Sequence, residues 1–328
     1  MKVLLWSDGK RDGSSFFPSL PLMKISAYHK RRGDSVDFYK EGDVDCDVFY
    51  KSKVFSFTED NTWTPKTGQV KQGGSGYAIT LIDGKEVYKK EQDRPIEKEV
   101  EESYPDYSLY PEFKKTALGF LTRGCPRRCG FCIVSHKDGC KSEKVADLTD
   151  IWRGQKYLKL MDANILASKD REGLIKQIIK SGSFVDYTQG LDARLVDDDI
   201  AKLLCKTKAQ MIHFAFDNIK DETAVMKGLR TFKKHCTIGT GATKVYVLTN
   251  YNSTFEEDMH RIRLCVDAGY QPYTMIYNAG EHDDFLRHLK RWTNSPYFHA
   301  CDFSEYRPNK NSPRMIDIYG DITKVRKG

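Results

Sequence analysis

The sequence predicts an α/β protein in which six β-α units form a partial (βα)6 barrel, preceded by a smaller α/β domain. Short apolar stretches alternate with helical apolar spacing from residue 117 onward, and a shorter alternation of the same kind occupies the first 60 residues. The chain of 328 residues is long enough for two domains. Consecutive β-α units imply a parallel sheet with right-handed crossovers, and closing a full barrel takes eight such units.

Six apolar stretches are candidates for the strands of the larger domain, which we place at residues 117–296. They are Leu118–Arg123, Tyr157–Asp162, Phe184–Gln189, Met211–Phe216, Lys244–Thr249 and Tyr273–Tyr277. Helical spacing follows most of them, as at Leu174 and Ile178 after the second strand. Thr254 and Glu257 form a capping box that predicts the start of the helix after the fifth strand. In such a fold the loops at the carboxyl ends of the strands carry the chemistry.

The rest of the chain divides into three further segments. Residues 1–60 form the small domain, residues 61–116 a hairpin with a charged connector, and residues 297–328 a C-terminal extension that we expect to be partly disordered. In the small domain we expect strands at Val3–Trp6, Val36–Tyr39 and Val48–Phe55 and a helix at Pro18–Lys30. The hairpin pairs Ile79–Leu81 with Glu86–Tyr88 through a turn at residues 83–84. The glycine run at residues 73–76 either faces a flat ligand or phosphate or forms a turn.

Composition points to a cytoplasmic protein without a membrane partner. No apolar run reaches the roughly 18 residues of a membrane span, and the first apolar stretch, which Asp8 interrupts, is too short for a signal peptide. Nine cysteines, of which three lie in one tight motif, fit a reducing compartment better than a disulfide framework. The net charge of +7 permits an anionic substrate but does not require one.

Three cysteines at 125, 129 and 132 carry the strongest chemical signal, with the spacing Cys-x3-Cys-x2-Cys. Three thiolates this close in sequence can hold three irons of a cubane iron–sulfur cluster and leave the fourth iron open to a ligand. One alternative is a structural zinc site with Cys140 or His136 as a further ligand, and another is a set of reduced thiols without a metal. The remaining five cysteines are scattered, and we expect them to act as small buried apolar residues.

The cysteine motif, its place after the first strand and Phe131 before the third cysteine together resemble the radical SAM superfamily. The segments at residues 105–110, 119–125, 161–164 and 189–195 resemble the subgroup with an N-terminal, Rossmann-like cobalamin-binding domain. The resemblance implies that Cys125, Cys129 and Cys132 hold a [4Fe-4S] cluster that binds S-adenosylmethionine. It implies reductive cleavage to a 5′-deoxyadenosyl radical, which abstracts hydrogen from an unidentified substrate, and an electron donor such as flavodoxin or ferredoxin.

The resemblance also implies a set of cofactor-binding residues, most of them at strand ends. They are Phe131, Asp162, Asn164, Gln189, Asp192, Arg194, Asp217 and Asn218. Asp162 and Asn164 are expected near the amino end of the methionine, and Arg194 is expected to pair with its carboxylate as a fork. Asp217 and Asn218 are expected near the ribose hydroxyls. In a competing interpretation these polar residues cap helices or satisfy loop backbone, and this applies more strongly to Asn250 and to the asparagine at 278.

Two departures limit what the resemblance implies. The loop after the first strand, residues 7–13, contains no histidine, so the Asp-x-His-x-x-Gly loop of cobalamin domains is absent and cobalamin stays doubtful. His213 lies inside an apolar strand, where we expect a packed barrel residue rather than a catalytic base. Two alternatives to the radical enzyme remain. One is a cobalamin- or RNA-linked methyltransferase or modification enzyme, and the other is a non-catalytic iron–sulfur or zinc protein.

Overall fold

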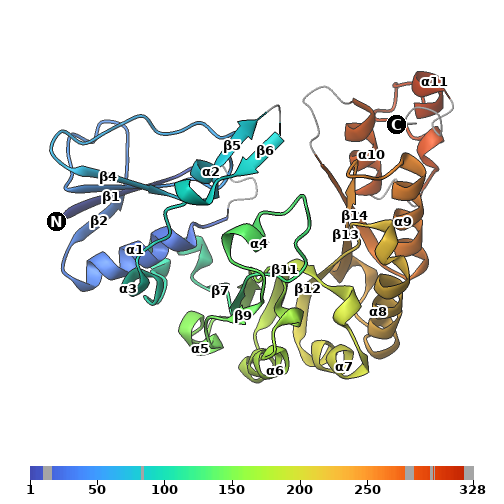
Figure 1. Ribbon diagram of the computed structural model, residues 1–328, viewed down its shortest axis with the longest axis horizontal. Coiled ribbons are helices and arrows are strands. Elements are labelled where there is room, and N and C mark those ends of the chain that lie inside the picture. Colours follow the sequence, from blue (N-terminus) through green and yellow to red (C-terminus); the bar gives the residue numbers. More distant parts are fainter. Residues whose placement is uncertain (10–16, 83–84, 278–283, 296–297, 299, 321–328) are drawn as a thin grey trace.

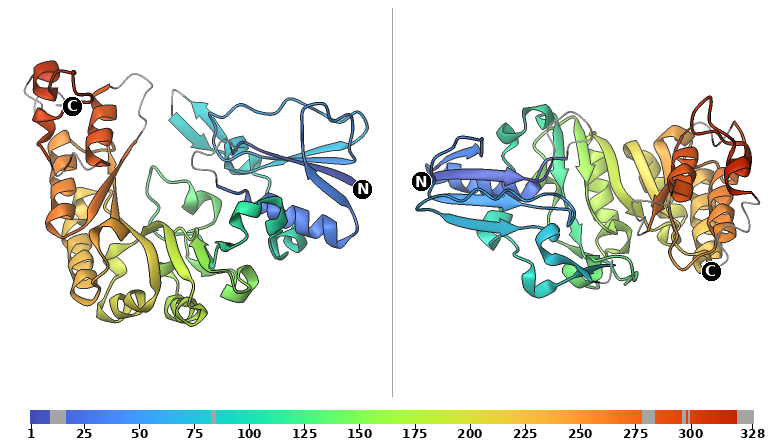
Figure 2. Two further views of the ribbon diagram at one scale, coloured as in Figure 1. Left: turned by 180° about the vertical axis from the view of Figure 1, so that it is seen from behind. Right: turned by 90° about the horizontal axis from the view of Figure 1, so that it is seen from above.

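The computed structural model describes residues 1–9, 17–82, 85–277, 284–295, 298 and 300–320. These residues form an α/β protein with a four-stranded and a six-stranded parallel sheet and interleaved helices, as the sequence predicts. The two sheets lie at opposite ends of an elongated molecule (Figures 1 and 2). None of the described helices is long and apolar enough to cross a membrane.

The first sheet has the strand order β2-β1-β3-β4. Its strands are β1 (Lys2–Ser7), β2 (Ser35–Phe38), β3 (Val48–Ser52) and β4 (Gln69–Gly73). Helix α1 (Leu20–Arg31) connects β1 to β2 and packs Leu22 and Ile25 against Val3 and Leu5. The chain therefore leaves the central strand β1 toward β2 on one side and returns to β3 on the other, which is a doubly wound arrangement.

Strand β4 was not predicted, and it extends the first sheet beyond residue 60. Its side chains are almost all exposed and mostly polar, because it lies at the edge of the sheet, so it lacks the apolar alternation that marks a half-buried strand. The predicted hairpin is confirmed as β5 (Ile79–Ile82) paired with β6 (Lys85–Tyr88), although its turn at 83–84 lies outside the described residues. Short helical turns fill the connector: α2 (Ser75–Ala78), η1 (Lys90–Gln92), α3 (Lys98–Glu101), η2 (Tyr107–Leu109) and η3 (Pro111–Phe113).

The second sheet has the order β14-β13-β12-β11-β10-β7, and every neighbouring pair is parallel. Its strands are β7 (Thr116–Gly119), β10 (Tyr157–Leu160), β11 (Phe184–Leu191), β12 (Lys208–Ala215), β13 (Thr243–Thr249) and β14 (Gln271–Ile276). All six predicted strands of this domain are confirmed, with shifted ends. Because all six strands run parallel, their carboxyl ends lie along one edge of the sheet.

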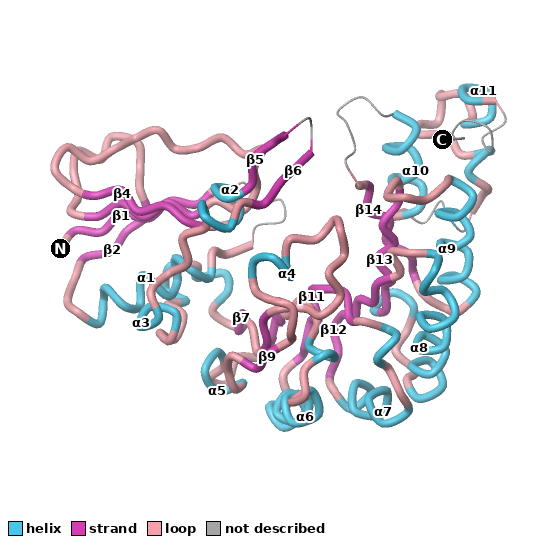
Figure 3. Tube along the Cα trace, in the orientation of Figure 1, coloured by secondary structure: helices cyan, strands magenta, loops and turns pink. Residues whose placement is uncertain are grey.

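Helices cover the outer face of this sheet and bury its main apolar core (Figure 3). They are α5 (Leu148–Ile151), α6 (Arg171–Ser181), α7 (Asp198–Lys206), α8 (Glu222–His235), α9 (Phe255–Asp267) and α10 (Asp284–Thr293). The predicted capping box at the start of α9 is confirmed, since Thr254 Oγ1 accepts from Glu257 N and the Glu257 carboxylate accepts from Thr254 N.

The predicted first strand, Leu118–Arg123, is divided in two. β7 ends at Gly119, and β8 (Thr122–Arg123) pairs antiparallel with β9 (Glu143–Lys144) outside the main sheet. The cause is a tertiary contact, because the Asp162 carboxylate accepts hydrogen bonds from the backbone N–H groups of Leu121 and Thr122 and turns the chain there.

The C-terminal extension is better packed than the sequence indicates. It contains η9 (Phe303–Glu305) and α11 (Met315–Tyr319), and its residues Phe303, Tyr306 and Met315 are buried in the core of the second sheet. Residues 303, 306 and 315 therefore pack with the core of the second sheet, while residues 297, 299 and 321–328 of the extension lie outside the described residues.

Candidate active site

The three motif cysteines lie on one loop, residues 124–133, which we call the cysteine loop. It leaves β8, ends at α4 (Val134–Lys137) and is held by a backbone hydrogen bond from Cys125 N to Gly139 O at 3.0 Å. Gly124 has φ +83°, and a Cβ at this position would lie 2.1 Å from Lys141 O. The loop therefore packs too closely against residues 138–141 for any side chain at position 124.

All three thiols are free and partly exposed. Burial raises the pKa of Cys129 to about 11, and the nearby Asp217 and the other two thiols add to the effect. Burial also raises the pKa of Cys132, again with a contribution from the Cys125 thiol. The three thiols therefore lie close enough to influence one another's ionisation, and they share their surroundings with Asp217.

The proposed further zinc ligands do not join this group. Cys140 and His136 are exposed, and the Cys140 thiol lies 3.7 Å from the Ser135 carbonyl. Within the described part of the chain, no three His, Cys, Asp or Glu side chains are arranged to hold one metal ion. Of the five scattered cysteines, 46, 236 and 265 are buried as expected, whereas 205 and 301 are partly exposed.

Asn164 and Asp192 connect two strand ends to the cysteine loop. Asn164 Nδ2 lies 3.6 Å from Cys125 Sγ and 3.4 Å from Asp192 Oδ2, and the Asn164 Oδ1 atom is buried without a hydrogen-bond partner. Arg127, on the cysteine loop, donates from Nε to Asp192 Oδ2 at 2.5 Å. Burial alone would raise the pKa of Asp192, but Arg194 and Arg127 outweigh it and hold the pKa below its usual value. Asp192 is therefore a fixed negative charge beside the loop.

Asp162 is buried at the end of β10, and one of its carboxylate oxygens accepts hydrogen bonds from the backbone. Its Oδ1 accepts from Leu121 N at 3.0 Å and from Thr122 N and Oγ1 at 2.5 and 2.7 Å. Its Oδ2 is buried and has no partner. Burial raises the pKa of this carboxyl to about 6 despite these hydrogen bonds. One oxygen thus positions the chain before the cysteine loop, while the other is available to a ligand.

Arg194 is engaged by two protein carboxylates rather than left as an open fork. Its Nε lies 2.8 Å from Asp192 Oδ1, and its Nη1 lies 2.6 Å from Asp221 Oδ2. The predicted pairing with a ligand carboxylate would require this arrangement to change. Asp221, at the start of α8, was not predicted, because nothing in the sequence distinguishes it from an ordinary first-turn acid.

Of three further predicted residues, Asp217 lies at the site, whereas Asn218 and Gln189 lie outside its hydrogen-bond network. Asp217 Oδ1 accepts from Leu248 N at 3.3 Å, and burial raises the pKa of this carboxyl to about 6. Asn218 is exposed and caps a short turn by accepting from Lys220 N, which fits the interpretation as a helix cap. Gln189 is exposed in the irregular end of β11, and its side chain makes no hydrogen bond with the described residues.

Through Phe131, the cysteine loop contacts a residue near the far edge of the six-stranded sheet. Its ring packs edge-on against Tyr251 at 5.1 Å, and Tyr251 packs in the same way against Tyr277 at 4.7 Å. A Cβ on Gly130 would lie 2.5 Å from the Tyr251 hydroxyl. The loop, which starts beside β7 at one edge of the sheet, therefore contacts the loops after β13 and β14 at the other edge. Sequence reasoning missed Tyr251.

Asn250 supports that far side. It adopts φ +64°, its N donates to Asp258 Oδ2 at 3.0 Å, and its Nδ2 donates to Tyr277 O at 2.9 Å. It therefore joins the ends of β13 and β14 and is a structural residue in this arrangement. The asparagine at 278 lies outside the described residues.

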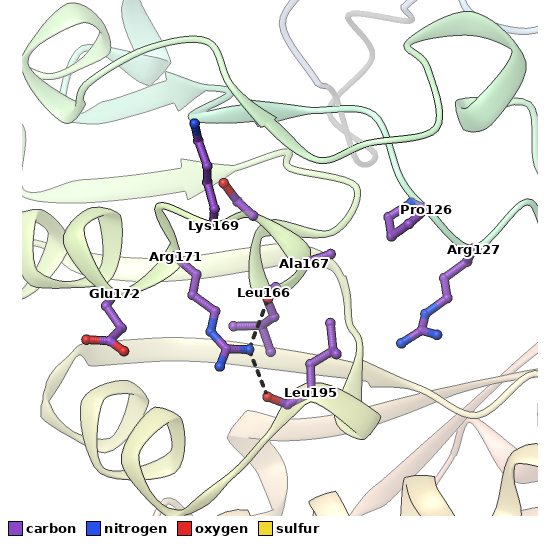
Figure 4. Close-up of a pocket in the computed structure, with 9 residues that line it drawn as sticks. Pro126, Arg127, Leu166, Ala167, Lys169, Arg171, Glu172 and Leu195 are labelled. Atoms are coloured by element: carbon purple, nitrogen blue, oxygen red, sulfur yellow. Dashed lines mark hydrogen bonds between the residues drawn. The ribbon is translucent and has the colours of Figure 1, made fainter.

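A cavity of about 790 Å³ lies beside the cysteine loop. Pro126 and Arg127 of the loop lie on one side of it, and Arg171 lies on the other (Figure 4). Arg171 donates to the carbonyls of Leu166 and Leu195 at 3.3 and 3.4 Å, so this wall is fixed by the protein itself.

The glycine run at residues 73–76 serves packing rather than a ligand. Cβ atoms on Gly74 and Gly76 would lie 2.2 Å from Lys53 O and 2.7 Å from Phe55 O, so these glycines allow two chain segments to touch. The run therefore packs closely against residues 53–55. It nevertheless adjoins the site, because Lys137 Nζ after the cysteine loop donates to Ser75 Oγ at 2.7 Å.

Fold and site together define an α/β protein with a three-thiol loop over the carboxyl ends of a parallel sheet. No family model matches the chain. A search of curated proteins likewise finds no matching sequence. The functional argument therefore depends on the motif and on the geometry around it.

Proposed function

We propose that the protein is a radical SAM enzyme. Cys125, Cys129 and Cys132 would hold a [4Fe-4S] cluster, and S-adenosylmethionine would bind at its open iron. The observation that carries the proposal is the Cys-x3-Cys-x2-Cys trio on a loop at the carboxyl ends of a parallel sheet, with no fourth cysteine in register. When bound, the cluster would supply the electron that cleaves S-adenosylmethionine to the radical that abstracts hydrogen from substrate.

The residues present fit such a cluster better than a zinc ion. A mononuclear zinc site needs its ligands to converge within about 2.3 Å of one point, and the described residues contain no group of three His, Cys, Asp or Glu side chains arranged to hold one metal ion. The thiolates of a cubane cluster bind separate irons, so they need not converge in this way. Because burial raises the pKa values of Cys129 and Cys132, both are protonated at neutral pH when free, and cluster binding would displace their protons.

The surrounding side chains supply groups that bind and orient a cationic ligand. Asp162 Oδ2 and Asn164 Oδ1 are buried acceptors without partners at the end of β10, and a donor such as an ammonium group would satisfy them. Asp192, held by two arginines, fixes the Asn164 amide beside Cys125. The contact of Phe131 with Tyr251 places the cysteine loop against the loop after β13. A flavodoxin or ferredoxin is the expected electron donor.

Anaerobic reconstitution of the full chain tests this proposal. We expect about four irons and four sulfides per chain and 5′-deoxyadenosine after S-adenosylmethionine and dithionite are added. Cys129→Ser should lose both, whereas the matched control Cys140→Ser should retain both because that thiol is exposed outside the loop. Stoichiometric zinc with no visible absorbance would contradict the proposal and favour the zinc protein. A cluster that forms but never cleaves S-adenosylmethionine would favour the non-catalytic iron–sulfur protein.

A further inference from the structure

The inner face of the six-stranded sheet carries polar and aromatic side chains where a closed barrel carries branched apolar ones. Lys159 pairs in register with Asp186, His213 with Lys244, and Tyr246 with Tyr273. The strand residues that alternate with them are buried against the helices, so these six side chains point to the opposite, concave side. We call these six residues the concave face. Such a face suits a polar ligand, because its charged and aromatic side chains can form hydrogen bonds and stacking contacts.

Lys159 and Asp186 form an ion pair on this face in which only one of the two Asp186 carboxylate oxygens contacts the lysine. Lys159 Nζ lies 3.0 Å from Asp186 Oδ2, while Asp186 Oδ1 is buried and has no hydrogen-bond partner among the described residues. His213 does not satisfy it, because its Nδ1 lies 2.8 Å from the Tyr187 carbonyl, which can only accept, and 4.0 Å from Asp186 Oδ1. The three side chains line a cavity of about 510 Å³.

The pair offers a donor beside an acceptor. The Lys159 ammonium has three N–H donors, of which Asp186 takes one, and Asp186 Oδ1 is a free acceptor. The complementary ligand group has a carbonyl oxygen beside an N–H, as an amide or a lactam does. Among nucleobases, guanine, uracil and thymine carry this edge, whereas adenine presents the opposite order of donor and acceptor relative to its sugar.

Aromatic rings and further lysines lie on the same face of the sheet as this cavity, and Tyr157 and His213 line the cavity itself. The His213 ring stacks on Tyr246 at 4.7 Å and 7°, and Tyr246 packs edge-on against Tyr273 at 5.6 Å. Large exposed rings follow at the rim, with Phe184 41% and Tyr273 36% exposed. Exposed aromatic rings interleaved with cations are typical of surfaces that stack bases and neutralise phosphates.

The lysines at the rim are available for phosphate. Lys156 and Lys208 each lie 5.9 Å from the Phe184 ring, and Lys244 lies 5.7 Å from the Tyr273 ring. Within the part of the chain that the structure describes, none of these three lysines forms an ion pair. Lys159 stands three residues before Asp162, or about 10 Å along the strand. The cavity therefore lies in the amino-terminal half of the strands, about 10 Å along the strand from the carboxyl ends that carry the cysteine loop.

We propose that the concave face binds a nucleotide whose base has a lactam edge, either as a free mononucleotide or within a single strand of nucleic acid. The Lys159–Asp186 pair reads the edge, the aromatic rings stack the base, and the rim lysines neutralise phosphate. That this nucleotide is the substrate rests on the proposed function. The binding site itself does not, because it requires no cluster.

Binding measurements on the full chain, without a cluster and after reconstitution, test the site. The probes are fluorescein-labelled 12-mers of oligouridylate and oligoadenylate, with UMP, GMP and AMP as competitors. We expect oligouridylate to bind about tenfold more tightly than oligoadenylate, with affinity that falls as salt rises. Preferred binding of UMP and GMP over AMP would identify a free nucleotide as the ligand, and binding of the 12-mer alone would identify a strand.

Variants assign the binding to this face. Asp186→Asn and Lys159→Met should each remove the preference for uridylate, with roughly a tenfold loss of affinity. Lys208→Gln at the exposed rim should reduce the salt slope by about one without changing base preference. The control is Lys176→Gln on α6, a lysine of the outer helices paired only with Glu172, which should bind as the wild type does.

Two results would overturn the site: no binding of any probe at low salt, or the same base preference in wild type and in both pair variants. Should the pair variants fail to fold in urea titrations, an unchanged salt slope in Lys208→Gln would overturn it instead. If binding and variants behave as expected while no 5′-deoxyadenosine is formed, the nucleotide site stands and only the radical SAM proposal fails.

Discussion

Single atoms without partners are the most informative features at the residue scale. Asp162 Oδ2, Asn164 Oδ1 and Asp186 Oδ1 are buried acceptors that no described donor satisfies. A buried acceptor without a partner costs on the order of 1–3 kcal/mol, so a fold that retains one needs a reason outside its own stability. The first two lie by the cysteine loop and the third lies on the concave face, which are the two places where we propose ligands.

The Asp162→Asn variant tests the charge at the first of these places. Its folded pKa of about 6 lies above the ordinary value of 3.8, so ionised Asp162 lowers stability, with no effect at low pH and the full effect above about pH 6. We expect Asp162→Asn to raise the free energy of unfolding by about 2–3 kcal/mol at pH 8 and by little at pH 4. Urea titrations at several pH values measure this difference. The exposed Asp199→Asn serves as control, and a gain that does not change with pH would refute the explanation.

At the scale of elements, tertiary contacts hold the strand ends and the cysteine loop in place. Arg261 on α9 is fully buried and donates to the carbonyls of Phe216 and Leu248, which ties the ends of β12 and β13 to one helix. Its charge is paired with Asp258, which also holds the backbone of Asn250. The base of the site is therefore rigid, and the cysteine loop gains its own shape from Gly124 and from the β8–β9 pair.

Two glycines of similar backbone conformation separate the effect of packing from that of strain. Gly124 and Gly139 have φ +83° and +97°, but only at Gly124 would a Cβ meet backbone oxygens, at 2.1 Å; at Gly139 nothing lies within 4 Å. We expect Gly124→Ala to lower the iron bound on reconstitution severalfold, because the loop must shift. Gly139→Ala should cost only the conformational strain, about 1 kcal/mol, and should retain its iron. Equal iron contents in the two variants would argue against a packing constraint on the loop.

At the scale of the whole molecule, contacts next to the site connect the domains of the two sheets. Glu101 of the connector pairs with Lys24 on α1 at 2.8 Å and with Arg123 on β8 at 3.4 Å. With the contact between Lys137 and Ser75, these bonds place the first domain against the cysteine loop. At the other end, the C-terminal extension completes the core of the barrel domain.

One helix of that extension supplies a matched pair of variants. Met315 on α11 is fully buried, whereas Ile318 on the same helix is 44% exposed. We expect Met315→Ala to lower the free energy of unfolding by about 2–5 kcal/mol and Ile318→Ala to change it by less than about 1 kcal/mol. Urea unfolding followed by tryptophan fluorescence measures both. Similar small losses in the two variants would mean that the extension is not part of the cooperative core.

The elements that could be predicted differ in kind from those that could not. The six barrel strands and the helix cap at Thr254 were predictable because alternation and capping depend on near neighbours in sequence. Strand β4 was not predicted because an exposed edge strand has no apolar alternation. The burial of Met315 was not predicted because its packing partners lie far along the chain. Lys159 and Asp186 occupy alternate positions of otherwise apolar strands. This pattern could have predicted the polar concave face, but it was not used for that purpose.

By itself the sequence determined the spacing of three thiols and the β-α alternation, since both are local properties of the chain. Only the tertiary structure decided that Asn164 meets both Cys125 and Asp192, that the Arg194 fork is engaged by carboxylates, and that Asp186 keeps an oxygen that no described donor satisfies. The physical reason is strand order. Residues dozens of positions apart become neighbours only when parallel strands align their carboxyl ends, and long-range packing sets that alignment.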